Sequence, residues 1–217
     1  MIDTPMSTKV TQALIVNKAI ELFNEFGAHH VSTNRIAEAC HLSKGNVHYH
    51  FKNKESLIQS IFERMAREIE DGWGDDHLRP TAEHMAKMFY RQLTMIWEYR
   101  FFYRELTPLL QNDRLLKKSF AALRKKRMAK LEIFFESLIS RGFLVGIDTP
   151  EDVSALITIS WIISDYWLSY IDVEEKNIDK NTIREGYLIM TQSLRPYLTD
   201  DARKKVDASF KLISQIN

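Results

Sequence analysis

The fold of this chain is decided by residues 33–54, TNRIAEACHLSKGNVHYHFKNK. Thr33 is placed to cap a short helix over residues 34–40, in which the apolar residues fall on one face. After a break of two residues, Ser43 is placed to cap a second short helix that ends near His50. The stretch therefore predicts two short helices joined by a tight turn.

The second of these helices carries side chains that suit a contact with DNA. A recognition helix places its N-terminal turn against base edges in the major groove, while a partner helix crosses the backbone. Gly45 permits a close approach of the backbone, Asn46 can form two hydrogen bonds with adenine, and Lys44 can donate to guanine or phosphate. Val47 is expected to point inward and anchor the helix. The pattern predicts a helix-turn-helix that binds double-stranded DNA.

The rest of the chain is also predicted to be helical. Apolar residues recur at three- and four-residue spacing, and the seven Gly and five Pro lie at helix-sized intervals. The expected helices are a first helix that ends before Gly27, followed by residues 54–71, 81–100, 103–111, 114–141, 153–170, 182–193 and 200–216. The expected fold class is therefore all-α.

Two domains are expected within this helical chain. Residues 1–53 are predicted to form a DNA-binding head of three helices, and residues 54–217 a larger helical C-terminal domain for ligand binding and dimerisation. The helix over residues 54–71 is expected to connect the two.

Composition and cysteine content favour a cytoplasmic protein. The 217 residues have a formal net charge of +1 and contain one cysteine, Cys40, so no disulfide can form within the chain. The N-terminal residues lack the apolar core of a signal peptide. The apolar stretch 153–171 contains Asp165 and several serines, and it is interpreted as a buried helix rather than a membrane span.

A longer motif surrounds the two short helices. It consists of Ala19-Ile20-Glu21-Leu22-Phe23, Gly27, Thr33-x-x-Ile36-Ala37 and Leu42-Ser43-Lys44-Gly45-x-Val47-x-Tyr49-His50-Phe51-Lys52-Asn53-Lys54-Glu55-x-Leu57. Together these residues resemble the N-terminal signature of the TetR family of bacterial transcriptional regulators. The resemblance implies a homodimeric, ligand-responsive repressor with an all-helical C-terminal domain. It also implies roles for eight residues: phosphate contacts for Thr33, Tyr49, His50 and Lys54, and positions near bases for Lys44, Gly45, Asn46 and His48.

The chain departs from the family pattern at two positions. His41 stands in the turn where the family usually has Gly, and Asn46 stands where it usually has Thr. Because His tolerates a left-handed backbone better than most residues, we expect the turn to form with some strain. Asn46 is expected to alter the base preference rather than abolish DNA binding.

A ligand cavity is expected in the C-terminal domain. Its helices contain more aromatic residues than core filling requires, and a cavity lined by aromatic residues with a few polar groups suits a small apolar ligand. Asp165 is isolated in an apolar helix and needs either a hydrogen bond from the protein or a polar group of the ligand. The candidate lining residues are Trp97, Phe102, Tyr103, Phe134, Trp161 and Asp165.

The helix over residues 153–170 predicts a dimer. It is apolar almost all round, whereas a helix of one globular domain usually has a polar face. Its second face is expected to contact another subunit, and together with residues 182–193 of each chain it would form a four-helix interface.

The sequence does not favour a metal site, a redox sensor or a second nucleic-acid-binding surface. His48 and His50 lie two residues apart on a helix and point away from each other, so no metal site and no cofactor are expected. Cys40 is interpreted as a buried apolar residue rather than a redox sensor. The basic run 124–127 is interpreted as a solvated helix face.

The sequence contains no Gly-rich phosphate loop and none of the paired His and Glu motifs of helical metalloenzymes, so an enzyme is not expected. The remaining alternative is a regulator of the same fold that acts through protein partners without a small-molecule effector.

Overall fold

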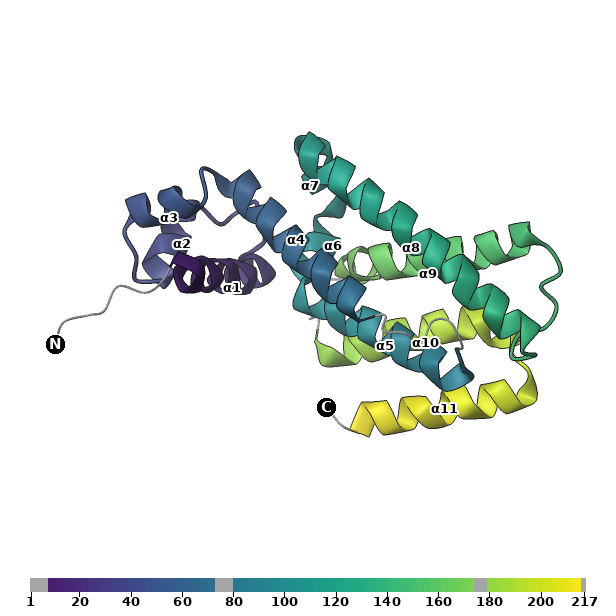
Figure 1. Ribbon diagram of the computed structural model, residues 1–217. Coiled ribbons are helices and arrows are strands. Elements are labelled where there is room, and N and C mark those ends of the chain that lie inside the picture. The colour runs from purple at the N-terminus through teal and green to yellow at the C-terminus, as the bar shows by residue number, and fades with distance from the viewer. Residues whose placement is uncertain (1–7, 73–79, 174–178, 216–217) are drawn as a thin grey trace. The chain divides into compact units, whose positions relative to one another are not determined.

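The computed structural model describes residues 8–72, 80–173 and 179–215, and all regular elements in these ranges are helices (Figure 1). This confirms the all-α prediction. The α-helices are α1 (Thr8–Phe26), α2 (Thr33–Ala39), α3 (Lys44–His50), α4 (Lys54–Asp71), α5 (Ala82–Glu98), α6 (Arg100–Arg104), α7 (Leu106–Asn112), α8 (Arg114–Ser140), α9 (Pro150–Asp172), α10 (Lys180–Leu194) and α11 (Asp200–Gln215). A short 3-10 turn, Arg195–Tyr197, follows α10.

The chain forms two compact units. The first consists of Met1–Arg67 with Tyr99–Lys117, and the second of Glu68–Glu98 with Lys118–Asn217. The first unit therefore joins the N-terminal helices to a segment distant in sequence, Tyr99–Lys117. The division into a head over residues 1–53 and a C-terminal domain stays a prediction about function.

The first unit has its core between α1, α4 and the distant α6. Phe23 and Phe101 have ring centroids 5.1 Å apart, and Phe62 stacks on Phe102 at 5.6 Å. The side-chain oxygen of buried Asn24 accepts a hydrogen bond from the Phe101 N–H at 3.0 Å. The aromatic pairs and this hydrogen bond hold α6 in the same unit as the helix-turn-helix.

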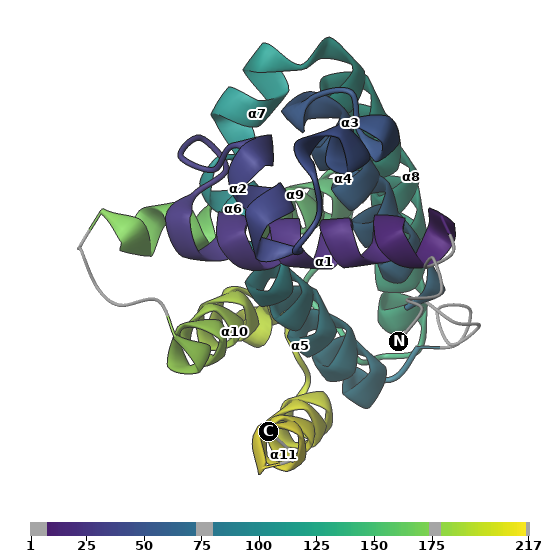
Figure 2. The same cartoon turned by 90° about the vertical axis from the view of Figure 1, so that its left-hand side faces the viewer.

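The second unit is built around α5, which packs against α9, α10 and α11 (Figures 1 and 2). Tyr187 of α10 stacks on Phe210 of α11 with ring centroids 4.2 Å apart. The indole N–H of Trp167 in α9 donates to the Thr182 carbonyl at 2.9 Å. Gly186 permits this contact, since a Cβ there would lie 2.7 Å from the Trp167 ring.

The expected helices are confirmed for most of the chain, and two breaks were missed. The ranges 81–100 and 103–111 are instead three helices, because the chain leaves helical geometry at Tyr99 and Glu105. These breaks allow Phe101 and Phe102 to enter the core of the first unit. The last expected residue of the final helix, 216, lies outside the described residues.

Among the described helices, none combines the length and the apolar character that a membrane crossing requires.

Candidate DNA-binding surface and ligand cavity

The turn between α2 and α3 is closed by two backbone hydrogen bonds. The N–H of Leu42 donates to the Ala37 carbonyl at 2.9 Å, and the N–H of His41 donates to the Glu38 carbonyl at 3.1 Å. This pairing is a Schellman motif, whose central residue adopts a left-handed backbone. His41 has φ 55°, so the expected left-handed backbone at this position is confirmed.

Helix α3 presents its polar residues on one exposed face. The Ser43 hydroxyl accepts from the Asn46 N–H at 3.1 Å, which confirms Ser43 as the N-cap. Val47 is buried and anchors the helix, as expected. Tyr49 is 80% exposed. The four residues expected near bases are exposed as well: Lys44, Gly45, Asn46 and His48.

The beginning of α2 differs from the prediction in its capping residue. Ser32, not Thr33, is the N-cap, and its hydroxyl accepts from the Arg35 N–H at 3.2 Å. Thr33 is the first helical residue and is partly exposed. The guanidinium of Arg35 lies 3.8 Å from the centroid of the Phe26 ring, which fixes α2 against the end of α1.

Lys54 holds the loop between α1 and α2. Its ammonium donates to the Ala28 carbonyl at 2.7 Å and to the His29 carbonyl at 3.3 Å. Glu105 contacts the same loop, because its carboxylate accepts from the Ala28 N–H at 2.7 Å. The sequence analysis did not predict the contacts of Lys54 and Glu105 with this loop, because each contact joins residues that are far apart in the chain.

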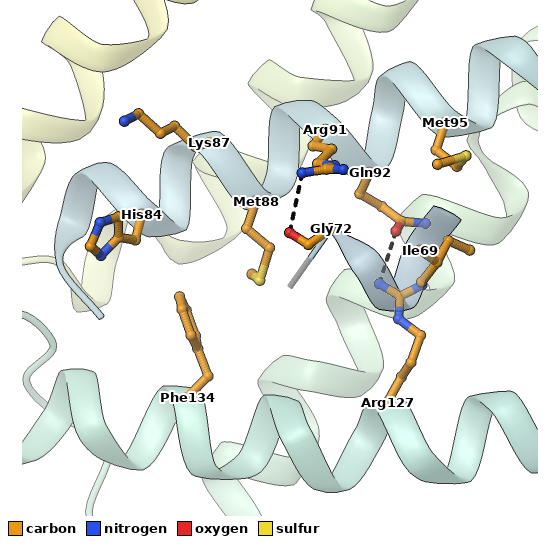
Figure 3. A pocket seen from close by; sticks show the side chains of 10 residues that line it. All are labelled: Ile69, Gly72, His84, Lys87, Met88, Arg91, Gln92, Met95, Arg127 and Phe134. Carbon is orange, nitrogen blue, oxygen red and sulfur yellow. Dashed lines mark hydrogen bonds between the residues drawn. The ribbon is translucent and has the colours of Figure 1, made fainter. Parts of the chain in front are cut away.

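A cavity of about 190 Å³ lies in the second unit between the end of α4, α5 and α8 (Figure 3). Arg91 donates to the Gly72 carbonyl at 3.3 Å, and Arg127 donates to the Gln92 side-chain oxygen at 2.8 Å. The lining residues are Ile69, Gly72, His84, Lys87, Met88, Arg91, Gln92, Met95, Arg127 and Phe134.

Arg127 is the main correction to the sequence analysis of α8. It was expected on a solvated face with the basic run 124–127, but it is only 7% exposed. Its position four residues before Leu131 and seven before Phe134, both buried, was the missed signal, because this spacing places it on the inner stripe of the helix.

Asp165 lies in a second, smaller cavity of about 30 Å³, which Arg127 and Gln92 also line. The Trp161 indole N–H donates to the Asp165 carboxylate at 2.6 Å, which is the protein hydrogen bond that the sequence analysis anticipated. Burial raises the pKa of the Asp165 carboxyl to about 6, while the Trp161 hydrogen bond and the charges of Arg127 and Arg124 act in the opposite direction.

The six expected ligand-contacting residues are divided among four places. Phe134 lines the larger cavity, and Trp161 and Asp165 line the smaller one. Phe102 and Tyr103 instead belong to α6 of the first unit, where both are buried. Trp97 is partly exposed in α5 and lines neither of these two cavities.

Comparison with known protein families agrees with this architecture. A model of the bacterial regulatory proteins of the tetR family matches residues 15–61, and a model described as a bacterial transcriptional repressor matches residues 62–206. The chain belongs to the TetR family of bacterial transcriptional regulators. The TetR proteins that it resembles are regulators and not enzymes, in agreement with the expectation from sequence.

Individual TetR relatives match different parts of the chain. The class A tetracycline repressor of transposon 1721 from Escherichia coli is 25% identical over 201 residues, which cover 93% of this chain and 82% of that protein. The regulator UidR of Escherichia coli K12 is 43% identical, but over 51 residues that cover 24% of this chain and 26% of UidR. The match to UidR thus spans about a quarter of that protein.

Solved structures share the fold. A TetR-family regulator from Marinobacter aquaeolei VT8 superimposes with a TM-score of 0.82 at 26% identity, covering 95% of this chain and 98% of that chain. SmeT, in complex with triclosan, gives a TM-score of 0.62 at 20% identity, covering 89% of this chain and 94% of that chain.

Proposed function

We propose that the protein is a homodimeric repressor whose α3 helices enter the major groove of a pseudo-palindromic operator. The observation that carries the proposal is the polar, exposed face of α3 around the single buried Val47. A small, largely apolar or aromatic molecule in the second unit would release the repressor from DNA. The head over residues 1–53 would bind DNA in the cytoplasm, and residues 54–71 would connect it to the C-terminal domain.

The DNA contacts are assigned by the chemistry of the exposed residues. Asn46 would form two hydrogen bonds with an adenine, and Lys44, Gly45 and His48 would lie near neighbouring bases. The phosphate contacts are assigned to Thr33, Tyr49, His50 and Lys54. The bonds of Lys54 to two carbonyls are compatible with this role, because an ammonium has three donors.

The homodimer is supported by exposed apolar side chains on the two helices predicted to form it. They recur on α9 at helical spacing and continue on α10. A set of exposed apolar side chains on neighbouring helices is typical of a protein interface. These exposed residues are Ile159, Ile162, Tyr166, Tyr170, Leu188 and Ile189. Two heads joined in this way would contact half-sites about 34 to 36 Å apart.

Release by a ligand requires a modest coupling between the cavity and the head. A coupling free energy of about 1 to 3 kcal/mol lowers operator affinity by roughly 5- to 150-fold. The cavity of about 190 Å³ in the second unit is the proposed site of the ligand.

Selection of DNA from a randomised pool by the purified protein tests the proposal. We expect sequencing to show an enriched inverted repeat, and we expect its affinity to fall steeply with salt because phosphate contacts release counterions. Lys44→Ala should weaken binding to the enriched repeat, whereas Lys125→Ala, which removes an exposed lysine of α8, should leave it unchanged. Failure to enrich any repeat would contradict the proposed function.

A further inference from the structure

The larger cavity is lined by basic and apolar side chains, and its described lining contains no carboxylate (Figure 3). We propose that its ligand is a small apolar molecule with a single carboxylate group, bound by Arg91 and Arg127. This inference rests on the proposed function, because it assumes that a ligand binds in the second unit, and it specifies the chemical class of that ligand.

Arg91 is positioned at the cavity by contact with Gly72. Its guanidinium donates to the Gly72 carbonyl at 3.3 Å, and a Cβ on Gly72 would lie 2.7 Å from the Arg91 Nε. The absence of a side chain at residue 72 thus permits the guanidinium to lie against the end of α4. A planar guanidinium in this position can present further N–H donors to a carboxylate in the fork geometry that such pairs favour.

Arg127 supplies a second cation from α8. Burial of its side chain reduces the competition of water for the guanidinium, which strengthens an interaction with an anion. Its hydrogen bond to Gln92 orients the guanidinium at the cavity wall (Figure 3).

Two carboxylates on the neighbouring elements have partners outside the larger cavity. Glu70 of α4, next to the lining residue Ile69, pairs with Lys126 and with Lys130 of α8. Asp165 lines the smaller cavity, where it accepts from Trp161 and also interacts with the charge of Arg127. The larger cavity therefore has positive character, and it favours an anion over a neutral or cationic ligand.

The remaining wall selects an apolar body of limited size. Ile69, Met88, Met95 and Phe134 supply apolar and aromatic contacts. A cavity of about 190 Å³ is comparable with the roughly 150 Å³ apolar cavity that holds one benzene ring. A single ring with a carboxylate, such as benzoate, therefore matches both the size and the charge of the site.

Calorimetric titration of the full chain without DNA tests this inference with three probes of one shape: benzoate, benzamide and benzylammonium. We expect benzoate to bind with a Kd below about 1 mM and at least about tenfold more tightly than the neutral amide, because a charge-assisted hydrogen bond is lost with benzamide. Benzylammonium should bind more weakly than either. Equal affinities of benzoate and benzamide, tighter binding of benzylammonium, or no saturable benzoate binding would each overturn the inference.

Two variants and a control test the contribution of Arg91 to binding of the carboxylate. Arg91→Gln should weaken benzoate about tenfold or more and leave benzamide unchanged. Gly72→Ala should weaken benzoate as well, because the new Cβ displaces the Arg91 guanidinium while all charges remain. Arg114→Gln, which removes an exposed arginine at the start of α8, should have no effect. Equal benzoate binding by the Arg91→Gln variant and the unmodified chain would overturn the inference.

Measuring operator affinity in the presence of each probe distinguishes a failure of this inference from a failure of the proposed function. Benzoate binding that leaves operator affinity unchanged would support the carboxylate site and contradict release by its ligand. Release of the operator by benzamide and not by benzoate would support ligand-dependent release and overturn the carboxylate site.

Discussion

Helices α3 and α9 expose opposite kinds of surface. Helix α3 buries Val47 and turns polar side chains to the outside, whereas α9 buries one apolar face and exposes another that includes Ile159, Ile162 and Tyr166. A polar face with hydrogen-bond donors suits a polyanion, and an apolar face suits a protein surface. The exposed side chains of each helix, and not its buried ones, therefore indicate which kind of partner the helix binds.

The largest expected effect is a charge placed on the exposed face of α9. Ile162→Glu should weaken the dimer by about 4 kcal/mol, or roughly a thousandfold, because a carboxylate would be buried in an apolar interface. Sedimentation equilibrium measures the dimer dissociation constant. Ile133→Glu on α8 is a matched control, since Ile133 and Ile162 are both 52% exposed. Equal effects of the two variants would remove the proposed distinction between these surfaces.

The buried face of α9 contains the carboxyl group of Asp165, whose effect on the free energy of unfolding depends on pH. Burial raises the pKa of Asp165 to about 6, whereas an unfolded aspartate has a pKa of about 4. The folded state holds the proton of Asp165 more tightly, so the contribution of this residue to stability falls as pH rises from about 4 to about 6.

Asp165→Asn removes this titration. The free energy of unfolding of the variant, relative to that of the unmodified chain, should rise by about 3 kcal/mol between about pH 4 and about pH 7. Urea unfolding at the two pH values measures the change. Asp148→Asn, at an exposed position, is the matched control. If the difference in the free energy of unfolding between Asp165→Asn and the unmodified chain did not change with pH, the proposed destabilising effect of the buried charge would be contradicted.

On α3 the expected effect is smaller and specific to sequence. Asn46→Ala should lose about 2 kcal/mol of binding at one base pair of the operator, and variation of that base pair should then have little effect. Lys54→Ala should instead weaken all DNA sequences alike. Titration of the two variants against an operator and its single-base variants measures both effects. A loss from Lys54→Ala that depends on sequence would contradict the assigned roles.

The smallest expected effect concerns the cap of α2. Ser32→Ala should lower the free energy of unfolding by about 1 kcal/mol, because it removes the hydroxyl that accepts from the Arg35 N–H. Thr33→Ala should cost less, since the structure shows Thr33 inside the helix. Denaturant unfolding of both variants measures the difference, and a larger cost for Thr33→Ala would restore Thr33 as the cap.

The helix-turn-helix was predictable because its determinants are local. The cap at Ser43, the inward Val47 and the left-handed His41 each depend on residues within one turn of helix. The same local rules could not choose between the neighbours Ser32 and Thr33, because both residue types cap helices well.

The ligand cavity was less predictable because it depends on tertiary packing. Phe102 and Tyr103 look like pocket residues in the sequence, yet the break at Tyr99 turns their helix toward the first unit. The charge of Arg127 suggested a solvated residue, although its position in the sequence places it on the buried, inner stripe of α8. Aromatic content predicted that a cavity exists, but only the fold determines which side chains line it.

The packing of α6 limits which fragments of the protein retain the complete core of the first unit. The chain passes between the two compact units three times, after Arg67, Glu98 and Lys117. A fragment that stops at residue 71 would lack Phe101 and Phe102 and would expose the apolar surfaces that they cover. A chimaeric sensor made by joining the DNA-binding head to a foreign ligand domain would therefore need to carry Tyr99–Lys117 with it, as a second piece of the same module.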